Sequence, residues 1–387
     1  MSALPPLQKP LTEKAETSFT LPSKYYLDAE IFELEKQQIF YKNWQYVAHQ
    51  SMLADAGDYV TIKICDENIF VIRSADGQLR AFYNICRHRA HELLTGSGNV
   101  RKLIVCPYHA WSYDTAGSLK VARMGEHRPG FDKAEFGLRE IKLEILCGCI
   151  FVNLDDNCQS LSELAVGLEQ DIRQNLPYLD EVSLAGTDLL GETKMDAGWK
   201  VVVDNYVECY HCRPAHKDFA SIVDMDHYQV DIHPYWSAQR GPEIRLQNSA
   251  YEINKDSAMQ QTIFWYLWPN TTFNVMPGSE ELAVFAVRPI DAGSSTFGGH
   301  SLVVGGEVYQ PRADYVSNIL APEDIHLCES VQRGLNSKSY DQGTFMVDPE
   351  NCGESEYALH HFHRLVQQAL SIDPAIDPAI DPAIDPA

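Results

Sequence analysis

The sequence predicts an α+β protein with an antiparallel β-domain over residues 45–155 and a mixed domain over residues 156–370. In the first range, short apolar and aromatic runs alternate with tight-turn signals such as Ala75-Asp76-Gly77. In the second range, helical apolar spacing and further strand-like runs follow one another. A chain of 387 residues is long enough to form two separate cores.

Strands are expected where β-branched and aromatic residues concentrate between turns. In the β-domain these ranges are 59–64, 69–72, 79–83, 103–105, 111–113, 119–121 and 149–153. In the mixed domain they are 184–194, 261–268, 272–276, 282–288 and 300–307, with 199–203 as a strand or the approach to a helix. Helices are expected at 161–178, 323–335 and 355–370.

Both ends of the chain differ from these domains. Residues 1–44 predict a Pro-rich arm and an amphipathic helix over 29–43, with Asp28 as its N-cap. Residues 371–387 carry a repeated Ile-Asp-Pro-Ala unit. Because Pro at every fourth position prevents a continued helix, we expect a disordered extension there.

Composition limits the class of partner. The formal net charge of −23 disfavours nucleic acid and anionic membranes, since the long-range field repels both. It is compatible with a small cationic or zwitterionic substrate. The sequence has no apolar run of membrane-spanning length and no signal peptide at its N-terminus, and its ten cysteines are irregularly placed. We therefore expect a protein of the reducing cytoplasm.

Two short hooks in the β-domain have the spacing of metal ligands. Cys86 and His88 form the first hook, and Cys106 and His109 form the second. A Rieske [2Fe–2S] cluster needs two thiolates on one iron and two imidazoles on the other. A tetrahedral Cys2His2 zinc site uses the same ligand types. Zinc fingers usually place Cys with Cys and His with His, so the mixed hooks favour the cluster.

A second dense stretch follows in the mixed domain. Asp204, Glu208 and His211 are spaced i, i+4 and i+7, which predicts one face of a helix, and His216 follows after Pro214. Two histidines and one carboxylate bind non-haem Fe(II) and leave positions open for O2. The carboxylate must come from a distant segment, where Asp324 is the candidate and Glu323 its competitor. The Cys209-x2-Cys212 pair is alternatively a zinc or redox motif.

Over about residues 20–370 the chain resembles the oxygenase (α) subunits of Rieske non-haem iron oxygenases. It is most similar to the members that oxidise quaternary ammonium compounds, the carnitine-type oxygenases. The segments that carry the resemblance are Phe82-Tyr83-Asn84-Ile85-Cys86, Cys106-Pro107-Tyr108-His109-Ala110-Trp111, residues 203–212, Pro322-Glu323-Asp324 and residues 329–335.

The resemblance implies a role for each ligand candidate. It implies a helix-grip α/β-sandwich catalytic domain with an antiparallel sheet. By the same resemblance, the cluster ligands of this chain are Cys86, His88, Cys106 and His109, and its iron ligands are His211, His216 and Asp324.

The resemblance also implies roles for three residues beside the iron ligands. Glu208 stands where the family usually has an Asp that links a cluster histidine of the neighbouring subunit to an iron histidine. Asn205 matches a position near the iron, and Asp204 is a possible supporting group. The chain departs from the family pattern at Arg87, usually Pro, and at Ala90, usually Gly.

By the same resemblance the chain is a monooxygenase that uses O2 and electrons from NAD(P)H, delivered by a separate flavin and iron–sulfur reductase. A head-to-tail homotrimer is implied. A carnitine-like substrate would be cleaved at its C–N bond to trimethylamine and an aldehyde. The alternatives are an N-demethylase of glycine betaine or proline betaine, an aromatic-ring dioxygenase, and a non-catalytic electron carrier or structural zinc protein.

Aromatic residues offer a cage for a trimethylammonium group. Alternating aromatics in a strand are also typical of core packing, so this role stays open. The candidates are Trp265, Tyr266, Trp268, Tyr235, Trp236 and Phe273.

Overall fold

The computed structural model describes residues 9–186, 190–350 and 352–370. Predictions for residues 1–8 and for the repeat at 371–387 lie outside the described residues. The chain divides into two compact units. One comprises Phe40–Leu189 with Val304–Gly306, and the other comprises Met1–Ile39, Leu190–Val303 and Glu307–Ala387. The domain limits expected from the sequence remain predictions.

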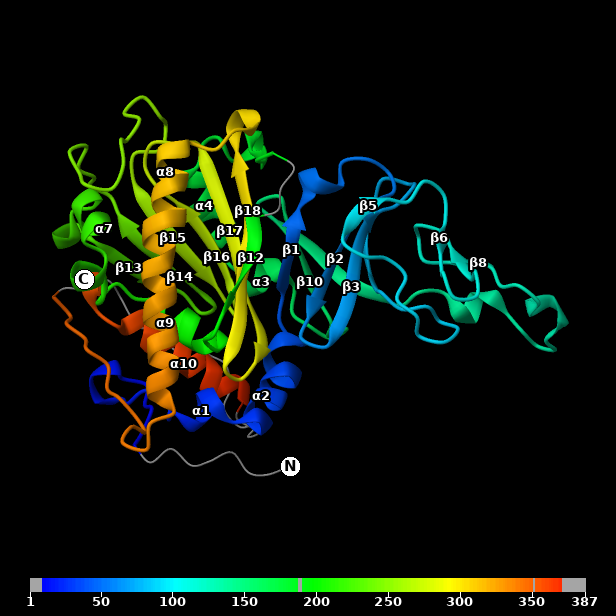
Figure 1. Cartoon of the computed structure of the whole chain (residues 1–387), viewed down its shortest axis with the longest axis horizontal. Coiled ribbons are helices and arrows are strands. Elements are labelled where there is room, and N and C mark those ends of the chain that lie inside the picture. The colour runs from blue at the N-terminus through cyan, green and yellow to red at the C-terminus, as the bar shows by residue number, and fades with distance from the viewer. Residues whose placement is uncertain (1–8, 187–189, 351, 371–387) are drawn as a thin grey trace. The chain divides into compact units, whose positions relative to one another are not determined.

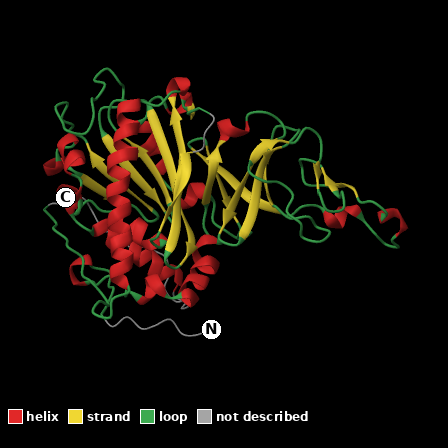
Figure 2. Ribbon diagram, viewed as in Figure 1, coloured by secondary structure: helices red, strands yellow, loops and turns green. Residues whose placement is uncertain are grey.

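The Phe40–Leu189 unit is built on antiparallel strands (Figures 1 and 2). Its seven-stranded sheet has the order β1-β10-β9-β4-β3-β2-β5, and a smaller sheet has the order β6-β7-β8. The strands are β1 Gln45–His49, β2 Asp58–Ile64, β3 Glu67–Arg73, β4 Leu79–Tyr83, β5 Ser97–Asn99, β6 Ile104–Val105, β7 Ser112–Tyr113, β8 Leu119–Val121, β9 Glu140–Leu146, β10 Cys149–Asn153 and β11 Ser183–Leu184. Helices α3 Leu161–Leu164 and α4 Leu168–Asn175 follow β10.

The other unit holds a long antiparallel sheet of order β18-β17-β16-β15-β14-β13, with β12 paired to β18. Its strands are β12 Leu190–Met195, β13 Gln229–Ile232, β14 Trp236–Gly241, β15 Thr262–Leu267, β16 Thr271–Val275, β17 Glu281–Asp291 and β18 Ser294–Val303. Its helices are α1 Lys24–Leu27, α2 Ala29–Glu35, α5 Trp199–Tyr206, α6 Cys212–Ala215, α7 Lys217–Ile222, α8 Gln310–Tyr315, α9 Ala321–Leu335 and α10 Tyr357–Leu370. Antiparallel sheets with associated helices confirm the α+β class.

Several local predictions are confirmed and others are wrong. Asp28 caps α2 by accepting hydrogen bonds from the backbone N–H groups of Glu30 and Ile31. The expected 161–178 helix is two helices, because Gly167 has φ 84° between them. Residues 199–203, for which a strand or the approach to a helix was expected, form the buried first part of helix α5. Strand β18 begins earlier than the expected 300–307 strand and ends at Val303.

Among residues 9–186, 190–350 and 352–370, no helix combines the length and the apolar character that crossing a bilayer requires.

Candidate active site

The two cysteine–histidine hooks lie on loops of the same construction. The backbone N–H of Ala90 donates to Cys86 O at 2.9 Å, and that of Ala110 donates to Cys106 O at 3.0 Å. Both alanines are left-handed, with φ of 52° and 58°. A left-handed backbone is most easily adopted by Gly, which gives a physical reason for the glycine that the family usually has at Ala90.

The hooks bring their four polar side chains together. Cys86 and Cys106 are buried, and the rings of His88 and His109 have centroids 4.7 Å apart. His109 Nδ1 is buried and has no hydrogen-bond partner among the described residues. A buried nitrogen without a partner costs free energy unless something else binds it. Two buried thiols beside such an imidazole therefore fit a [2Fe–2S] cluster with mixed ligands.

Neighbouring side chains complete this pocket. Tyr113 OH lies 3.3 Å from Cys86 Sγ and accepts a hydrogen bond from the backbone N–H of Arg87 at 3.0 Å. Burial raises the pKa of the Cys86 thiol. Burial, followed by the positive charges of His88, Arg89 and other nearby groups, lowers the pKa of His109. A neutral imidazole is the form that binds a metal.

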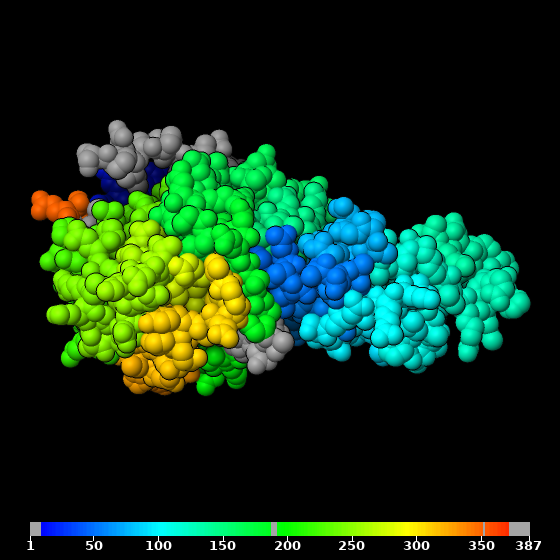
Figure 3. Space-filling view, turned by 90° about the horizontal axis from the view of Figure 1, so that it is seen from above, coloured from blue at the N-terminus to red at the C-terminus, as the bar shows by residue number. Residues whose placement is uncertain are grey.

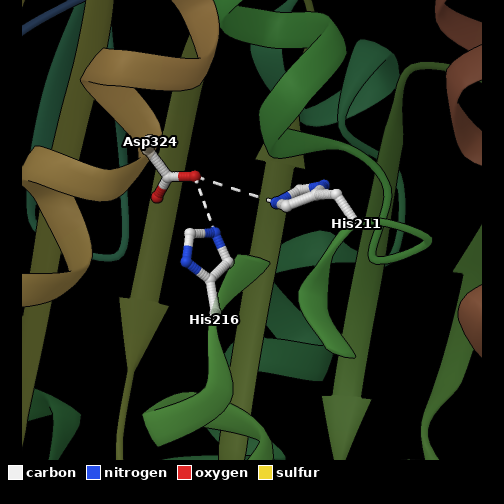
Figure 4. Close-up of side chains that lie close together, drawn as sticks. All are labelled: His211, His216 and Asp324. Atoms are coloured by element: carbon white, nitrogen blue, oxygen red, sulfur yellow. Dashed lines mark hydrogen bonds and ion pairs between the residues drawn. The ribbon is translucent and has the colours of Figure 1, made fainter. Parts of the chain in front are cut away.

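His211, His216 and Asp324 converge in the other unit (Figure 4). Asp324 Oδ1 lies 2.9 Å from His216 Nε2 and 3.7 Å from His211 Nε2. The side chain of His216 is 3% exposed, whereas those of His211 and Asp324 are 20% and 33% exposed. Two imidazoles and one carboxylate with one side toward solvent fit a mononuclear Fe(II) with open positions.

A second carboxylate faces each histidine from the opposite side of the ring. His211 Nδ1 lies 2.5 Å from Glu208 Oε1, and His216 Nδ1 lies 2.8 Å from Glu323 Oε2. A carboxylate on Nδ1 fixes the tautomer that leaves Nε2 free to bind a metal. Burial lowers the pKa of His216, but the hydrogen bonds and charges of Asp324 and Glu323 outweigh this effect and raise it.

The expectation that Asp204, Glu208 and His211 share one helix is wrong. Helix α5 ends at Tyr206, and α6 starts only at Cys212. The Glu208 carboxylate accepts hydrogen bonds from the backbone N–H groups of Tyr210 and His211. By binding nearby backbone donors it stabilises a turn in place of a continued helix.

Asp204 contacts residues from both ends of the chain. Tyr26 OH donates to its Oδ2 at 2.7 Å, and His363 Nε2 lies 3.0 Å from its Oδ1. His363 Nδ1 accepts from the backbone N–H of Leu21, so Nε2 carries the proton and donates to Asp204. The next residue, Asn205, donates to Asp324 Oδ1 at 2.7 Å.

The start of α5 is held by a buried ion pair. Glu35 accepts hydrogen bonds from Lys200 Nζ and, at 2.8 Å, from Trp199 Nε1. Both charged side chains are almost fully buried. The N-terminal segment therefore contacts α5 at its first turn through Glu35 and at its last turn through Tyr26.

Cys209 and Cys212, which the sequence leaves open as a zinc or redox motif, are joined as a disulfide. The bond encloses Tyr210 and His211, and Glu208 lies directly before it. Zinc binds cysteine as a thiolate, and neither Cys209 nor Cys212 has one in the disulfide.

The six aromatic candidates do not form a single cluster. Phe264 pairs with Asn274, which accepts from Tyr206 OH of α5 at 2.8 Å, so this face of the sheet is toward α5. Trp265 and Phe273 pair with each other and are each one residue away from this pair, so their side chains point to the opposite face of the sheet. Trp236 pairs with Leu267, which is two residues from Trp265, so Trp236 also lies on that opposite face.

Two of the remaining three candidates contact the same ring of α10. Tyr266 and Trp268 contact Phe362 of α10, each with ring centroids 6.0 Å from it, and Tyr235 is half-buried. A substrate role for these rings remains a prediction. Phe264 belongs to the same aromatic run of the sequence and lies on the face of the sheet toward α5. Phe264 is half-buried and contacts Tyr206 and Phe219.

Comparisons with protein families and with known proteins agree on the family of this chain. Residues 43–129 match the family described as Rieske [2Fe-2S] domain, and residues 190–372 match the ring hydroxylating alpha subunit (catalytic domain). The chain is 38% identical to the carnitine monooxygenase oxygenase subunit of Acinetobacter baumannii, over 95% of this chain and 99% of that protein. It is 28% identical to the chloroplastic choline monooxygenase of Amaranthus tricolor, over 92% and 79%.

Solved structures of related proteins have the same fold over most of this chain. A quaternary ammonium Rieske monooxygenase superimposes with a TM-score of 0.84 at 38% identity, covering 92% of this chain and 96% of that chain. Naphthalene 1,2-dioxygenase from Rhodococcus sp. gives 0.76 at 20% identity, covering 92% and 95%, which is a likeness of fold alone. The chain therefore belongs to the Rieske non-haem iron oxygenases, and it is an oxidoreductase whose cofactors are a [2Fe–2S] cluster and a mononuclear iron.

Proposed function

We propose that this oxygenase subunit is a monooxygenase that oxidises a quaternary ammonium compound with C–N cleavage, carnitine or a close analogue being favoured. The observation that carries the proposal is the 38% identity, over nearly the whole chain, to oxygenase subunits of carnitine monooxygenases. From carnitine the expected products are trimethylamine and an aldehyde. The electrons would come from NAD(P)H through a separate flavin and iron–sulfur reductase, in the cytoplasm.

Each cofactor is assigned to residues that the structure brings together. The proposed cluster ligands are Cys86, His88, Cys106 and His109, and the proposed iron ligands are His211, His216 and Asp324. When bound, the cluster supplies single electrons and the iron supplies the activation of O2 for attack on a C–H bond.

The surrounding groups orient these ligands. Glu208 and Glu323 hold the Nδ1 protons of His211 and His216, so both Nε2 atoms face Asp324. Asn205 donates to Asp324 Oδ1 and restricts the rotation of that carboxylate. Asp204 does not touch the three ligands and acts by fixing the end of α5.

Glu208 is also proposed to connect the two centres in a homotrimer. Its carboxylate is already bound to His211 and to two backbone N–H groups, so its position is well defined. A carboxylate can accept hydrogen bonds from imidazoles on two sides. In a head-to-tail trimer the second imidazole would be a cluster histidine of the neighbouring subunit.

The proposed substrate suits the local chemistry. Phe264, on the face of the sheet toward α5, offers an aromatic surface to N-methyl groups, which interact favourably with π-systems.

A substrate panel tests the proposal. Protein purified without oxygen and supplied with a reductase and NADH would be offered carnitine, γ-butyrobetaine, choline, glycine betaine, proline betaine and an aromatic acid. We expect carnitine-dependent O2 consumption with one trimethylamine formed per turnover, and loss of both in Asp324→Asn. Formaldehyde in place of trimethylamine would instead identify an N-demethylase. Oxidation of choline alone, or of the aromatic acid alone, would overturn the carnitine assignment.

A further inference from the structure

Helix α9, which carries the proposed iron ligand Asp324, continues directly from α8 through a π-helical turn at Val316–Leu320 (Figure 1). Such turns are rare within α-helices and are frequent at functional sites. Successive steps of five residues in the π-turn and four in the α-helix place Tyr315, Leu320 and Asp324 along one side of the helix. Tyr315 and Leu320 pack in one apolar cluster, so this side faces the interior of the unit.

The Tyr315 hydroxyl is a buried donor without a partner. Tyr315 is 2% exposed, and its hydroxyl has no hydrogen-bond partner among the described residues. A buried hydroxyl that makes no hydrogen bond costs free energy, which a ligand that accepts its proton can recover.

The surroundings of Tyr315 belong to the candidate site. Its ring contacts that of Tyr251, with centroids 5.7 Å apart, and lies in the same apolar cluster as Phe264. Figure 3 shows the yellow-orange outer surface of α8 beside the yellow-green segment before β15, from which Tyr251 comes. Burial, followed by nearby negative charges that include Glu323 and Asp324, raises the pKa of Tyr315. The hydroxyl therefore lies within the electrostatic range of the iron site.

The Nε–H of Arg312, three residues before Tyr315 on α8, is a second buried donor without a partner among the described residues. The guanidinium donates to Glu281 through another nitrogen, and Glu281 also accepts from Ser301 Oγ at 2.7 Å. Burial raises the pKa of Tyr251, and the positive charge of Arg312 opposes this effect. Arg312 therefore lies near the tyrosine that contacts Tyr315.

The strand register places the Arg312–Glu281 pair on the same face of the sheet as Phe264. Phe264 pairs with Asn274, and Asn274 pairs with Ala283. Because side chains two residues apart in a strand share a face, Glu281 lies on the face of Ala283. This is the face toward α5, so the unpartnered donor of Arg312 lies on the same side of the sheet as that helix.

The two ends of this region differ in charge. Asp324, Glu323 and Glu208 surround the two histidines, whereas Tyr315 and Arg312 offer hydrogen-bond donors. Carboxylates repel an anionic group and attract a cationic one. Tyr315 precedes Asp324 by nine residues, so their Cα atoms lie within about 14 Å at the helical rise of about 1.5 Å per residue. A small zwitterion can therefore be held at both ends, in one orientation.

We propose that the Tyr315 hydroxyl and the Arg312 Nε–H bind the carboxylate of a zwitterionic quaternary ammonium substrate whose cationic end lies at the iron site. The inference rests on the proposed function and narrows its substrate class to compounds that carry a carboxylate. Two donors match the two oxygens of that group. A site with buried donors rejects an analogue that leaves them unpaired, so a cation without the carboxylate binds more weakly.

The probes are γ-butyrobetaine and butyltrimethylammonium, which share the trimethylammonium group and the alkyl chain but differ in the carboxylate. Calorimetry on the holoenzyme, without O2 or reductase, would give the Kd of each. Tyr315→Phe removes only the hydroxyl. Arg312→Met combined with Glu281→Gln removes the second donor without leaving a buried charge unpaired. Tyr309→Phe is the matched control, since that hydroxyl donates to the backbone of Glu252 at 2.7 Å.

We expect Tyr315→Phe to weaken γ-butyrobetaine binding about tenfold, as a hydrogen bond to a charged group does, and butyltrimethylammonium binding less than twofold. The double variant should change the two affinities in the same way, and Tyr309→Phe should change neither. Urea unfolding should find Tyr315→Phe no less stable than the unaltered protein, because its hydroxyl has no partner in the free protein.

Three results would overturn the inference. The first is an unchanged affinity for γ-butyrobetaine in Tyr315→Phe or in the double variant. The second is equal weakening of both probes, which would indicate a distorted site in place of a lost contact. The third is unaltered protein that binds butyltrimethylammonium as tightly as γ-butyrobetaine. Failure of the proposed function is distinct, because the unaltered holoenzyme would then bind neither probe, and the inference would fall with it.

Discussion

Replacing Glu323 tests how the structure divides two adjacent carboxylates between two roles. Asp324 Oδ1 faces the Nε2 atoms of both His211 and His216, whereas Glu323 Oε2 faces Nδ1 of His216. By this geometry Asp324 is the ligand and Glu323 orients a ligand. Glu323→Gln keeps a side-chain oxygen that can accept the Nδ1 proton and removes only the negative charge.

The expected size of the effect follows from the environment of Glu323. Loss of a carboxylate that orients a metal-bound histidine typically costs about 10–100-fold in metal affinity, or about 1.4–2.7 kcal/mol. The Glu323 side chain is 37% exposed, so water screens part of its charge. We therefore expect Glu323→Gln to weaken Fe(II) binding by about tenfold. Asp324→Asn should remove most of the mononuclear iron, because it replaces an anionic ligand by a neutral one.

The assay separates the two metal centres. Anaerobic titration with Fe(II) would give the affinity of the mononuclear site, and cluster absorbance would provide an internal measure of intact protein. Glu329→Gln is the control, since it makes the same charge change on α9 and retains an acceptor for the backbone N–H of Asp196. A loss of iron in Glu323→Gln as complete as in Asp324→Asn would refute this division of roles, and so would normal iron binding in Asp324→Asn.

Three further predictions concern the cluster and the stability of the fold. Tyr113→Phe removes the hydroxyl 3.3 Å from Cys86 Sγ and should lower the cluster potential by about 20–60 mV in a redox titration, since one hydrogen bond contributes about 0.5–1.5 kcal/mol; an unchanged potential would contradict this. Lys200→Met leaves the buried Glu35 carboxylate without its cation and should lower the free energy of unfolding, measured in urea, by about 3–5 kcal/mol. The double variant that also carries Glu35→Gln should recover most of this lost stability. Burial lowers the pKa of His361 from 6.5 to about 4, so below pH 6.5 the unfolded chain binds a proton there that the folded chain does not. His361 should therefore contribute about 2 kcal/mol to the loss of stability from pH 7 to pH 5, and urea unfolding of His361→Gln should show a loss smaller by that amount.

Short-range spacing predicts the cluster loops because their ligands are fixed by local turns. Cys86 and His88 lie within one loop, and so do Cys106 and His109, so the residue types and their separation already contain the geometry. The convergence of His211 and His216 with Asp324 is different. It depends on α9, more than 100 residues further along the chain, and the resemblance to a family suggested it where spacing could not.

Periodicity failed where side chains bind the backbone or where burial decides the fold. The i, i+4, i+7 spacing of Asp204, Glu208 and His211 fits a continuous helix. The helix nevertheless ends before Glu208, because the Glu208 carboxylate binds the backbone N–H groups of the turn that follows. Strand alternation likewise does not predict which face of the sheet, and so which aromatic rings, lie toward α5. Only the pairing of Phe264 with Asn274, and the contact of Asn274 with α5, show that Trp265 points the other way.

The position of the iron site depends on segments that contribute no ligand to it. Helix α5 has eight residues, and a helix this short is not stable on its own. Its first turn is held by Glu35 and its last turn by Tyr26 and His363, which come from opposite ends of the described chain. Because Asn205 lies in this helix and the turn of Glu208 and His211 follows it, the two ends of the described chain help to determine where these groups lie relative to Asp324. Neither Tyr26 nor His363 carries a signal of this role in its own sequence neighbourhood, since the pairing arises only when the fold brings both to Asp204.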